Sequence, residues 1–243
     1  LNKFIEYARQ LGKRIAITAS TGIAASHIDG VTIHSWSGLG IAEQISDEEL
    51  ERMSWKPYIK DKYNRCDILI IDEVSMLHGE YLDMVERACR WVRRNDLPFG
   101  GLQVKLVGDL FQLPPVSRNN DPTYVHQSEA WLKADLTVCY LTEQHRQGAD
   151  DKLLDLLRSM RAGDFTPEQK KLLDSRVELD HSDDITRLYT HNVDVDAMNR
   201  RKLEELDAAI RTKQMRHDGD PYRVQAMKRS ILAPETFYWA VGA

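Results

Sequence analysis

Residues 67–73 read DILIIDE, an apolar run that ends in two acidic side chains. Four consecutive branched apolar residues predict a strand buried on both faces, as in a parallel sheet covered by helices. An apolar strand followed by Asp72 and Glu73 is also the Walker B pattern. There the first acid holds Mg²⁺, and the second orients or deprotonates the water that attacks a γ-phosphate. The alternative is a buried strand whose terminal acids only cap the next helix.

On both sides of this run, strand and helix patterns alternate. Strands are predicted over 14–18, 67–72, 104–107 and 136–141, and helices over 1–11, 23–28, 80–94 and 152–160. Later in the chain, a strand over 185–190 and a helix over 193–206 repeat the pattern. This alternation predicts an α/β fold with a parallel sheet flanked by helices.

The same pattern suggests how the chain divides. We predict a first domain over 1–162, interrupted by a small insertion at 40–65 where polar and aromatic residues break the rhythm. Residues 163–184 contain glycine, proline and a charge cluster, and are interpreted as a linker with one helix. Residues 185–243 are then the beginning of a second, incomplete α/β domain.

A second polar segment, GDLFQLPP, follows the predicted strand 104–107. The carboxyl ends of strands are where α/β sheets bind ligands, so Asp109 and Gln112 are candidates to face a phosphate. The two prolines prevent a regular helix after them. The alternative is an ordinary loop that stops at proline.

Further candidates lie near the remaining strands. Residues 19–22 (ASTG) follow the strand 14–18, and small or hydroxyl residues at a helix N-terminus can cradle a nucleotide or DNA phosphate; a simple N-cap is the alternative. His34 is interpreted either as a nucleic-acid contact or as a solvated loop residue, and Trp36 as core or as a stacking face. Arg146, after the strand 136–141, is interpreted as an arginine finger or as half of a salt bridge.

Composition excludes several classes of protein. The chain has 243 residues, 42% of them hydrophobic and 29% charged, with no apolar run long enough to span a membrane. Its three cysteines lie far apart without CxxC spacing, which argues against a zinc site or a disulfide framework. The net charge is −5, although residues 200–229 carry nine Lys/Arg against five Asp/Glu. We interpret that basic stretch as a solvated helix face.

The sequence contains no Walker A loop, which requires G-x-x-x-x-G-K-[ST]. The single Gly-Lys pair, Gly12-Lys13, is followed by Arg14 and preceded by a predicted helix. A Walker A loop is followed by a helix, and this chain opens in one. We therefore expect the loop to lie just before Leu1, and the chain alone to be inactive.

These motifs together resemble those of the Pif-type (Pif-one) ATP-dependent DNA helicases, in the Pif/RecD-like branch of helicase superfamily 1. The resemblance is carried by AITASTGIAASHIDGVTIHSWSGLG (16–40), LIIDEVSML (69–77), SMLHGEYLDMVERACRWVRR (75–94), GDLFQLPPV (108–116), LTEQHRQGADDKLLDLLRSMRAG (141–163) and RLYTHNVDVDAMNRRKLEEL (187–206). Departures are mostly losses: motif I and the later motifs of the second domain are missing. His145 also stands where an aromatic residue is common.

The resemblance implies a RecA-like P-loop NTPase fold and an enzyme that uses ATP and Mg²⁺. It implies 5′–3′ translocation on single-stranded DNA and unwinding at duplex junctions, in replication, repair, recombination or telomere maintenance. Residues 40–65 would form a small wedge subdomain.

The resemblance also implies roles for individual residues. In the ATPase site, Asp72 would be the Mg²⁺ acid, Glu73 the hydrolytic base and Gln112 the γ-phosphate sensor, with Arg146 as finger and Asp109 beside the nucleotide. The predicted DNA-track residues are Thr21, Gly22, His34 and Ser35.

Two other functions remain open at this point: a non-helicase P-loop ATPase, and an inactive remnant that only binds DNA or a partner. Stimulation of ATPase by single-stranded DNA would separate the first from a helicase. We expect a monomer without membrane attachment. Its expected compartment is the bacterial cytoplasm, or the nucleus or mitochondrion in a eukaryote.

Overall fold

The chain divides into two units, Leu1–Thr166 and Pro167–Ala243, which are described separately. The computed structural model describes residues 1–116, 122–143, 145, 152–177, 186–189, 192–221, 224–225, 228 and 234–243. In the described part of the chain, no helix is long and apolar enough to cross a membrane.

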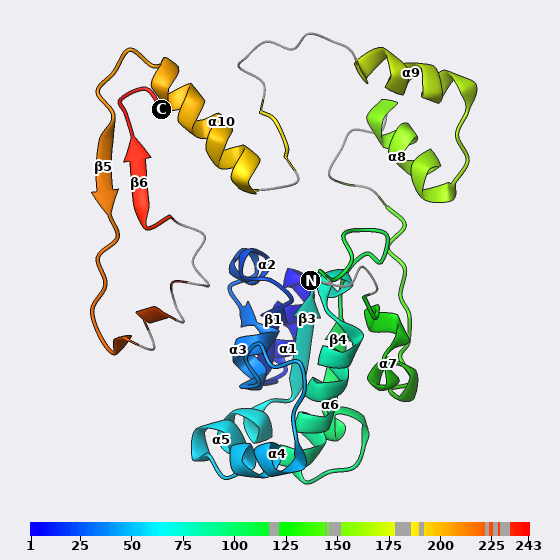
Figure 1. Ribbon diagram of the computed structural model, residues 1–243. Coiled ribbons are helices and arrows are strands. Elements are labelled where there is room, and N and C mark those ends of the chain that lie inside the picture. Colours follow the sequence, from blue (N-terminus) through cyan, green and yellow to red (C-terminus); the bar gives the residue numbers. More distant parts are fainter. Residues whose placement is uncertain are drawn as a thin grey trace. The chain divides into compact units, whose positions relative to one another are not determined.

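The first unit is built on a four-stranded parallel sheet (Figure 1). Its strands, in the spatial order β2-β1-β3-β4, are β1 (Ile15–Ala19), β2 (Val31–Thr32), β3 (Ile68–Asp72) and β4 (Gln103–Leu106). The run that was predicted to decide the fold, β3, lies between β1 and β4. The predicted parallel α/β architecture is therefore confirmed for this unit.

Both faces of β3 are covered, as its uninterrupted apolar run predicts. Ile68 and Ile70 pack on one face against α1 (Asn2–Gln10). Leu69 and Ile71 belong to the larger core on the other face. These four side chains are at most 3% exposed, so every position of the strand before Asp72 carries a buried apolar side chain.

Helices and short 3-10 turns complete the first unit. They are α2 (Gly22–His27), α3 (Ile33–Ser37), α4 (Asp47–Ser54), α5 (Pro57–Arg65), η1 (Val74–Met76), α6 (Gly79–Arg93), η2 (Pro98–Gly101), η3 (Val125–Gln127), α7 (Glu129–Lys133) and α8 (Lys152–Ala162). The longest, α6, was predicted from apolar residues at helical spacing, and that face is buried in the larger core. The buried apolar residues of α6 are Tyr81, Leu82, Met84, Val85, Ala88, Cys89 and Val92.

Residues 40–65, expected to be a small insertion, hold α4 and α5. Both helices contact α6, and their apolar residues Leu50 and Ile59 are buried in the main core. Tyr63 is fully buried and stacks on Trp36 with 4.8 Å between ring centroids, so Trp36 is a core residue rather than a free stacking face. The correspondence of this segment to a wedge subdomain stays a prediction.

Two predicted strands are wrong where the structure describes them. Residues 136–141 form no strand, and five of the six side chains are exposed. The described sheet ends at β4 and offers this segment no neighbouring strand to pair with. Of the predicted strand 185–190, only 186–189 are described; none of these four is in a strand, and Leu188 is 97% exposed.

The second unit contains α9 (Pro167–Val177), α10 (Asn192–Glu205), β5 (Arg211–Gln214) and β6 (Thr236–Trp239). Helix α9 lies in the predicted linker, and α10 confirms the helix predicted over 193–206. The strands β5 and β6 pair antiparallel, with Arg211 opposite Trp239. The assignment of residues 185–243 to the beginning of a second RecA-like domain stays a prediction.

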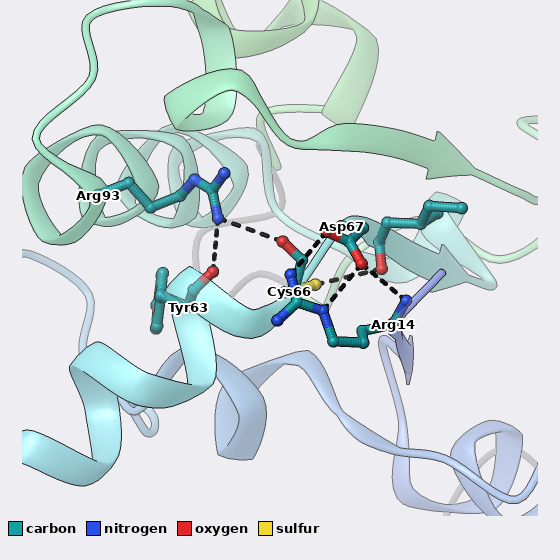
Figure 2. A network of polar contacts seen from close by, with 6 residues as sticks. Arg14, Tyr63, Cys66, Asp67 and Arg93 are labelled. Carbon is teal, nitrogen blue, oxygen red and sulfur yellow. Dashed lines mark hydrogen bonds and ion pairs between the residues drawn. The ribbon is translucent and has the colours of Figure 1, made fainter. Parts of the chain in front are cut away.

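A polar network closes the amino ends of the central strands (Figure 2). Arg14 donates to both carboxylate oxygens of Asp67, at 2.9 Å from Nε and 2.9 Å from a terminal nitrogen. On the other side of the same turn, Arg93 of α6 donates to the carbonyls of Tyr63 (2.6 Å) and Cys66 (3.2 Å). The turn between α5 and β3 is therefore held by the residue before β1 on one side and by the end of α6 on the other.

Candidate functional site

The candidate residues converge because the parallel strands end at one edge of the sheet. In register, Ala19 of β1 lies opposite Asp72 of β3, and Thr32 of β2 lies opposite Ala19. The segments that follow β1, β2, β3 and β4 therefore all leave the sheet at its carboxyl edge, where α/β folds bind ligands. This edge holds every predicted site residue of the first unit that the structure describes.

The acidic pair at the end of β3 has an unusual backbone. Glu73 has a φ of +51°, the left-handed conformation that is costly for a residue with a side chain. Its N–H donates to Oδ1 of Asp72 at 3.0 Å. Strained backbones of this kind are concentrated at functional sites. Both side chains are half-buried, and among the described residues neither carboxylate has an ion-pair partner.

The loop after β4 is folded around Asp109. Its Oδ1 accepts the Phe111 N–H at 3.1 Å, and the backbone N–H of Gln112 donates to the Asp109 carbonyl at 3.0 Å. The Gln112 side chain is exposed and lies 3.4 Å from Oδ2 of Asp109. The two residues predicted to face a phosphate are thus held together by the loop itself.

Arg161 of α8 forms an ion pair with Asp109, and its guanidinium also lies 5.3 Å from the centroid of the Phe111 ring. Burial raises the pKa of Asp109, but the hydrogen bonds that it accepts, first of all from Arg161, outweigh burial and bring the pKa below its ordinary value. Sequence reasoning missed this arginine. The sequence candidates were chosen because they follow predicted strands, whereas Arg161 lies on the last helix of the first domain.

Gly108 lets this loop approach the acidic pair. A Cβ at this position would lie 2.9 Å from the backbone nitrogen of Val74, the residue after Glu73. The Val74 N–H donates to the Val107 carbonyl at 3.0 Å, which joins the two loops. A glycine is therefore required here for close approach of two backbones.

The predicted DNA-track residues occupy the ends of β1 and β2. Thr21 is the N-cap of α2, and its Oγ1 accepts the Ala24 N–H at 3.2 Å. Gly22 begins α2 in open space, and Ser35 is exposed on α3. A role for these residues in DNA binding is compatible with this geometry and stays a prediction.

His34 is more constrained than a solvated loop residue. It is half-buried in α3, and its ring lies 4.3 Å from the ring of Tyr81, centroid to centroid. Burial, and secondly the charge of His78, lower the pKa of His34 below its ordinary value, which favours the neutral ring. A contact of His34 with DNA would then be a hydrogen bond or a stacking contact rather than a charge pair.

Arg146 lies outside the described residues, and its predicted role as a finger stays a prediction. The described neighbour His145 is exposed and lies 3.2 Å from a carboxylate oxygen of Glu143.

Sequence reasoning also passed over Ser20 as an individual residue. Its Oγ–H donates to the Glu73 carbonyl at 2.7 Å, and its N–H donates to the Asp72 carbonyl at 3.1 Å.

The carboxyl edge can hold a divalent cation through few protein ligands. Among the described residues there is no cluster of three or more His, Cys, Asp and Glu side chains placed to bind a metal ion. Mg²⁺ is usually bound by one or two carboxylates together with water and substrate phosphates, so the Asp72–Glu73 pair fits this ion.

Comparison with known proteins gives consistent matches. The sequence pattern of the PIF1-like helicase family matches residues 1–171. The chain is 39% identical over 253 residues to the ATP-dependent DNA helicase Pif1 of Psychrobacter sp. (strain PRwf-1). The alignment covers 100% of this chain and 38% of that protein. The chain thus spans little more than a third of that relative.

Solved structures agree with the sequence match. The Pif1 helicase from Candida albicans superposes with a TM-score of 0.81 and 28% identity, over 99% of this chain and 56% of that one. The Bacteroides Pif1 helicase in complex with ADP-AlF3 and single-stranded DNA superposes with a TM-score of 0.69 and 29% identity, over 95% and 55%. These matches confirm the predicted RecA-like α/β fold.

Proposed function

The chain belongs to the PIF1-like helicase family, and we propose from this premise that it is part of an ATP-dependent DNA helicase that moves 5′ to 3′ on single-stranded DNA. The observation that carries the proposal is the acidic pair Asp72–Glu73 at the carboxyl edge of β3. It has a strained backbone at Glu73 and no cationic partner among the described residues. The nucleotide-bound and DNA-bound relative supports the same site by analogy.

In the proposed mechanism, Asp72 would hold Mg²⁺ and Glu73 would take the proton of the attacking water. Bound Mg²⁺ would neutralise charge on the β- and γ-phosphates. The left-handed backbone at Glu73 turns the chain sharply after the strand, so two consecutive acids can serve different roles. The residues Asp109 and Gln112 lie on the loop joined to this turn through Val74, where Gln112 would sense the γ-phosphate.

Arg146 would stabilise the charge that grows on the transferred phosphoryl group, as an arginine finger does. The proposed ATPase also needs a Walker A loop, which the 243 residues do not contain. We therefore use the term complete motor for a protein that contains this chain together with a Walker A loop and a complete second RecA-like domain.

DNA would run over the ends of β1 and β2, past Thr21, Gly22, His34 and Ser35. These residues share the carboxyl edge with the acidic pair, which supports a track close to the ATPase site. Unwinding would occur where this strand leaves a duplex junction. Because its proposed substrate is DNA, we propose that the protein acts in the bacterial cytoplasm, or in the nucleus or mitochondrion of a eukaryote.

The test is the ATPase activity of the complete motor with and without single-stranded DNA. Stimulation by DNA is expected, together with unwinding of a duplex that has a 5′ single-stranded tail and not of one with a 3′ tail. His34→Ala should raise the DNA concentration that gives half-maximal stimulation and leave the DNA-independent rate unchanged. ATPase that ignores DNA would instead favour the non-helicase ATPase.

A further inference from the structure

We propose that Ser20 is a positioning residue that holds the backbone of the Asp72–Glu73 pair and links it to α2. The inference rests on the function proposed above for that pair. Ser20 is the first residue after β1, and it is 8% exposed. Its contacts reach two consecutive carbonyls on the neighbouring strand end.

Ser20 contacts the end of β3 through both its backbone and its side chain. The N–H of Ser20 donates to the Asp72 carbonyl at 3.1 Å, which continues the pairing of β1 with β3 one residue beyond Ala19. The Oγ–H of Ser20 then donates to the Glu73 carbonyl at 2.7 Å. One residue therefore holds the carbonyls of both proposed site acids.

The backbone of Glu73, which Ser20 contacts, is in the left-handed conformation. A left-handed backbone is unfavourable for a residue with a Cβ, so it persists only where surrounding contacts fix it. The Glu73 N–H is fixed by Asp72, and the Glu73 carbonyl accepts the Met76 N–H at 3.3 Å in addition to the Ser20 hydroxyl. The hydroxyl is the shorter of the two contacts on that carbonyl, and the only one from outside the turn among the described residues.

Ser20 also directly precedes the proposed DNA-track residues Thr21 and Gly22. Thr21, the residue after Ser20, is the N-cap of α2, and Gly22 begins the helix. A displacement of α2 by bound DNA would reach the Glu73 carbonyl through one peptide bond and one hydrogen bond. This path predicts that DNA binding changes the position of the proposed base.

The effect on catalysis follows from how strictly a general base must be placed. A misplacement of about 1 Å can lower a rate by about 10²-fold. Loss of the Ser20 hydroxyl should therefore reduce kcat, while the groups that contact ATP and DNA stay in place. KM for ATP and the affinity for single-stranded DNA should change little.

The matched control is Ser54 on α4. It is 7% exposed, its Oγ–H donates to the Glu51 carbonyl at 2.8 Å, and its Oγ accepts from a terminal nitrogen of Arg94 at 3.4 Å, so Ser54→Ala removes a hydroxyl of similar burial away from the carboxyl edge. In the complete motor, Ser20→Ala should lower the DNA-stimulated kcat by ~10-fold or more, and Ser54→Ala by less than ~2-fold, at similar melting temperatures. Ser20→Thr retains the donor and should recover most of the lost rate. Equal kcat for both alanine variants, or a parallel loss of kcat, DNA affinity and melting temperature in Ser20→Ala alone, would overturn the proposal.

A second measurement needs no ATPase and uses the 243-residue chain. Amide hydrogen exchange over residues 73–77 should be faster in Ser20→Ala than in the parent and unchanged in Ser54→Ala. Adding a single-stranded oligonucleotide should alter exchange of this segment in the parent and not in Ser20→Ala. Identical exchange in all three proteins would refute the positioning role even if the motor proves to be a helicase. Conversely, a motor without DNA-stimulated ATPase would refute the proposed function, while faster exchange without DNA would still support the contact.

Discussion

The two ends of β3 carry the same side chain in opposite situations. At the amino end, Asp67 accepts three hydrogen bonds from Arg14, one from its backbone N–H and two from its guanidinium. At the carboxyl end, Asp72 accepts the N–H of Glu73, and in the described part of the chain no cation lies beside it. Four buried strand residues, 68–71, separate an acid paired with Arg14 from a half-buried acidic pair that has no ion-pair partner among the described residues.

This difference separates a stabilising contact from a functional one. The guanidinium of Arg14 fixes where the chain enters the sheet, and its hydrogen bonds hold the pKa of Asp67 well below the ordinary value. The acids at the other end remain available for a cation and a water molecule. Substitutions at the two ends should therefore change different measurements.

The largest effect is expected from Glu73→Gln in the complete motor. The amide keeps the size of the side chain but cannot take a proton, so kcat should fall by roughly 10²–10⁴-fold while ATP affinity is nearly unchanged. The measurement is steady-state ATPase with nucleotide binding measured separately.

Two controls define the range of that experiment. Glu129→Gln, an exposed acid on α7 paired with Lys133, should keep the parent rate. The 243-residue chain alone should show no turnover above Glu73→Gln, because no backbone cradle or lysine holds the phosphates. Parent-like hydrolysis by Glu73→Gln would remove the Walker B assignment and with it the contrast between the two ends.

The paired variants Asp72→Asn and Asp67→Asn test the contrast directly. Asp72→Asn should weaken Mg²⁺-nucleotide binding by ~10-fold or more with little change in melting temperature, since it removes a cation ligand and no ion pair. Asp67→Asn should lower the melting temperature by a few degrees and leave kcat and nucleotide affinity unchanged. Titration calorimetry and thermal unfolding of both variants give the comparison. If both lose stability alike, the distinction between the two ends fails.

Much of the carboxyl edge could be predicted from the sequence because its signals are local. The uninterrupted apolar run of β3 identified the central strand. The polar residues after 104–107 were predicted to be site residues because ligands bind where parallel strands end. The Arg14–Asp67 pair was not predicted, because the partners are 53 positions apart and neither lies in a motif. The same reason applies to Arg161, which reaches Asp109 from another element.

The failed strands show the opposite limit. Residues 136–141 have the apolar content of a strand, but Val138 is 59% and Leu141 97% exposed because the described sheet offers no partner edge there. Pairing is a property of the whole sheet, so local apolar content cannot decide it. Residues 40–65, predicted to be a small insertion from their polar and aromatic residues, contribute Tyr63 to the main core, and their correspondence to a wedge subdomain stays a prediction.

A smaller effect, on stability, is expected from Gly108→Ala, in the loop after β4 that approaches the acidic pair. Gly108→Ala places a methyl group against the Val74 backbone nitrogen, which cannot move without shifting the turn at Glu73, and should destabilise the unit by about 1–3 kcal/mol. Gly22→Ala is the matched control: its Cβ would meet nothing within 4 Å, and alanine favours the helix, so stability should be unchanged or slightly higher. Denaturant unfolding of the 243-residue chain measures both. Equal stability of the two variants would mean that the loops do not need this close approach.

The smallest effect is the pH dependence contributed by Asp67. Because its pKa is lowered in the folded state, the unfolded chain takes up a proton first as the pH falls below about 4, the ordinary value for an aspartate. The stabilisation from the Arg14 contacts is therefore complete at neutral pH and is lost progressively as the pH falls below that value. The pair is partly exposed, with 56% of the Arg14 and 31% of the Asp67 side chain accessible, so solvent screening limits the change to a small fraction of the total stability.

Asp67→Asn should lack this component, so the melting temperatures of parent and variant, different at pH 7, should converge toward pH 3. A difference that stays constant from pH 7 to pH 3 would show that the stability lost in Asp67→Asn does not depend on ionisation of the carboxylate, and the amino end of β3 would then be held by hydrogen-bond geometry rather than by charge.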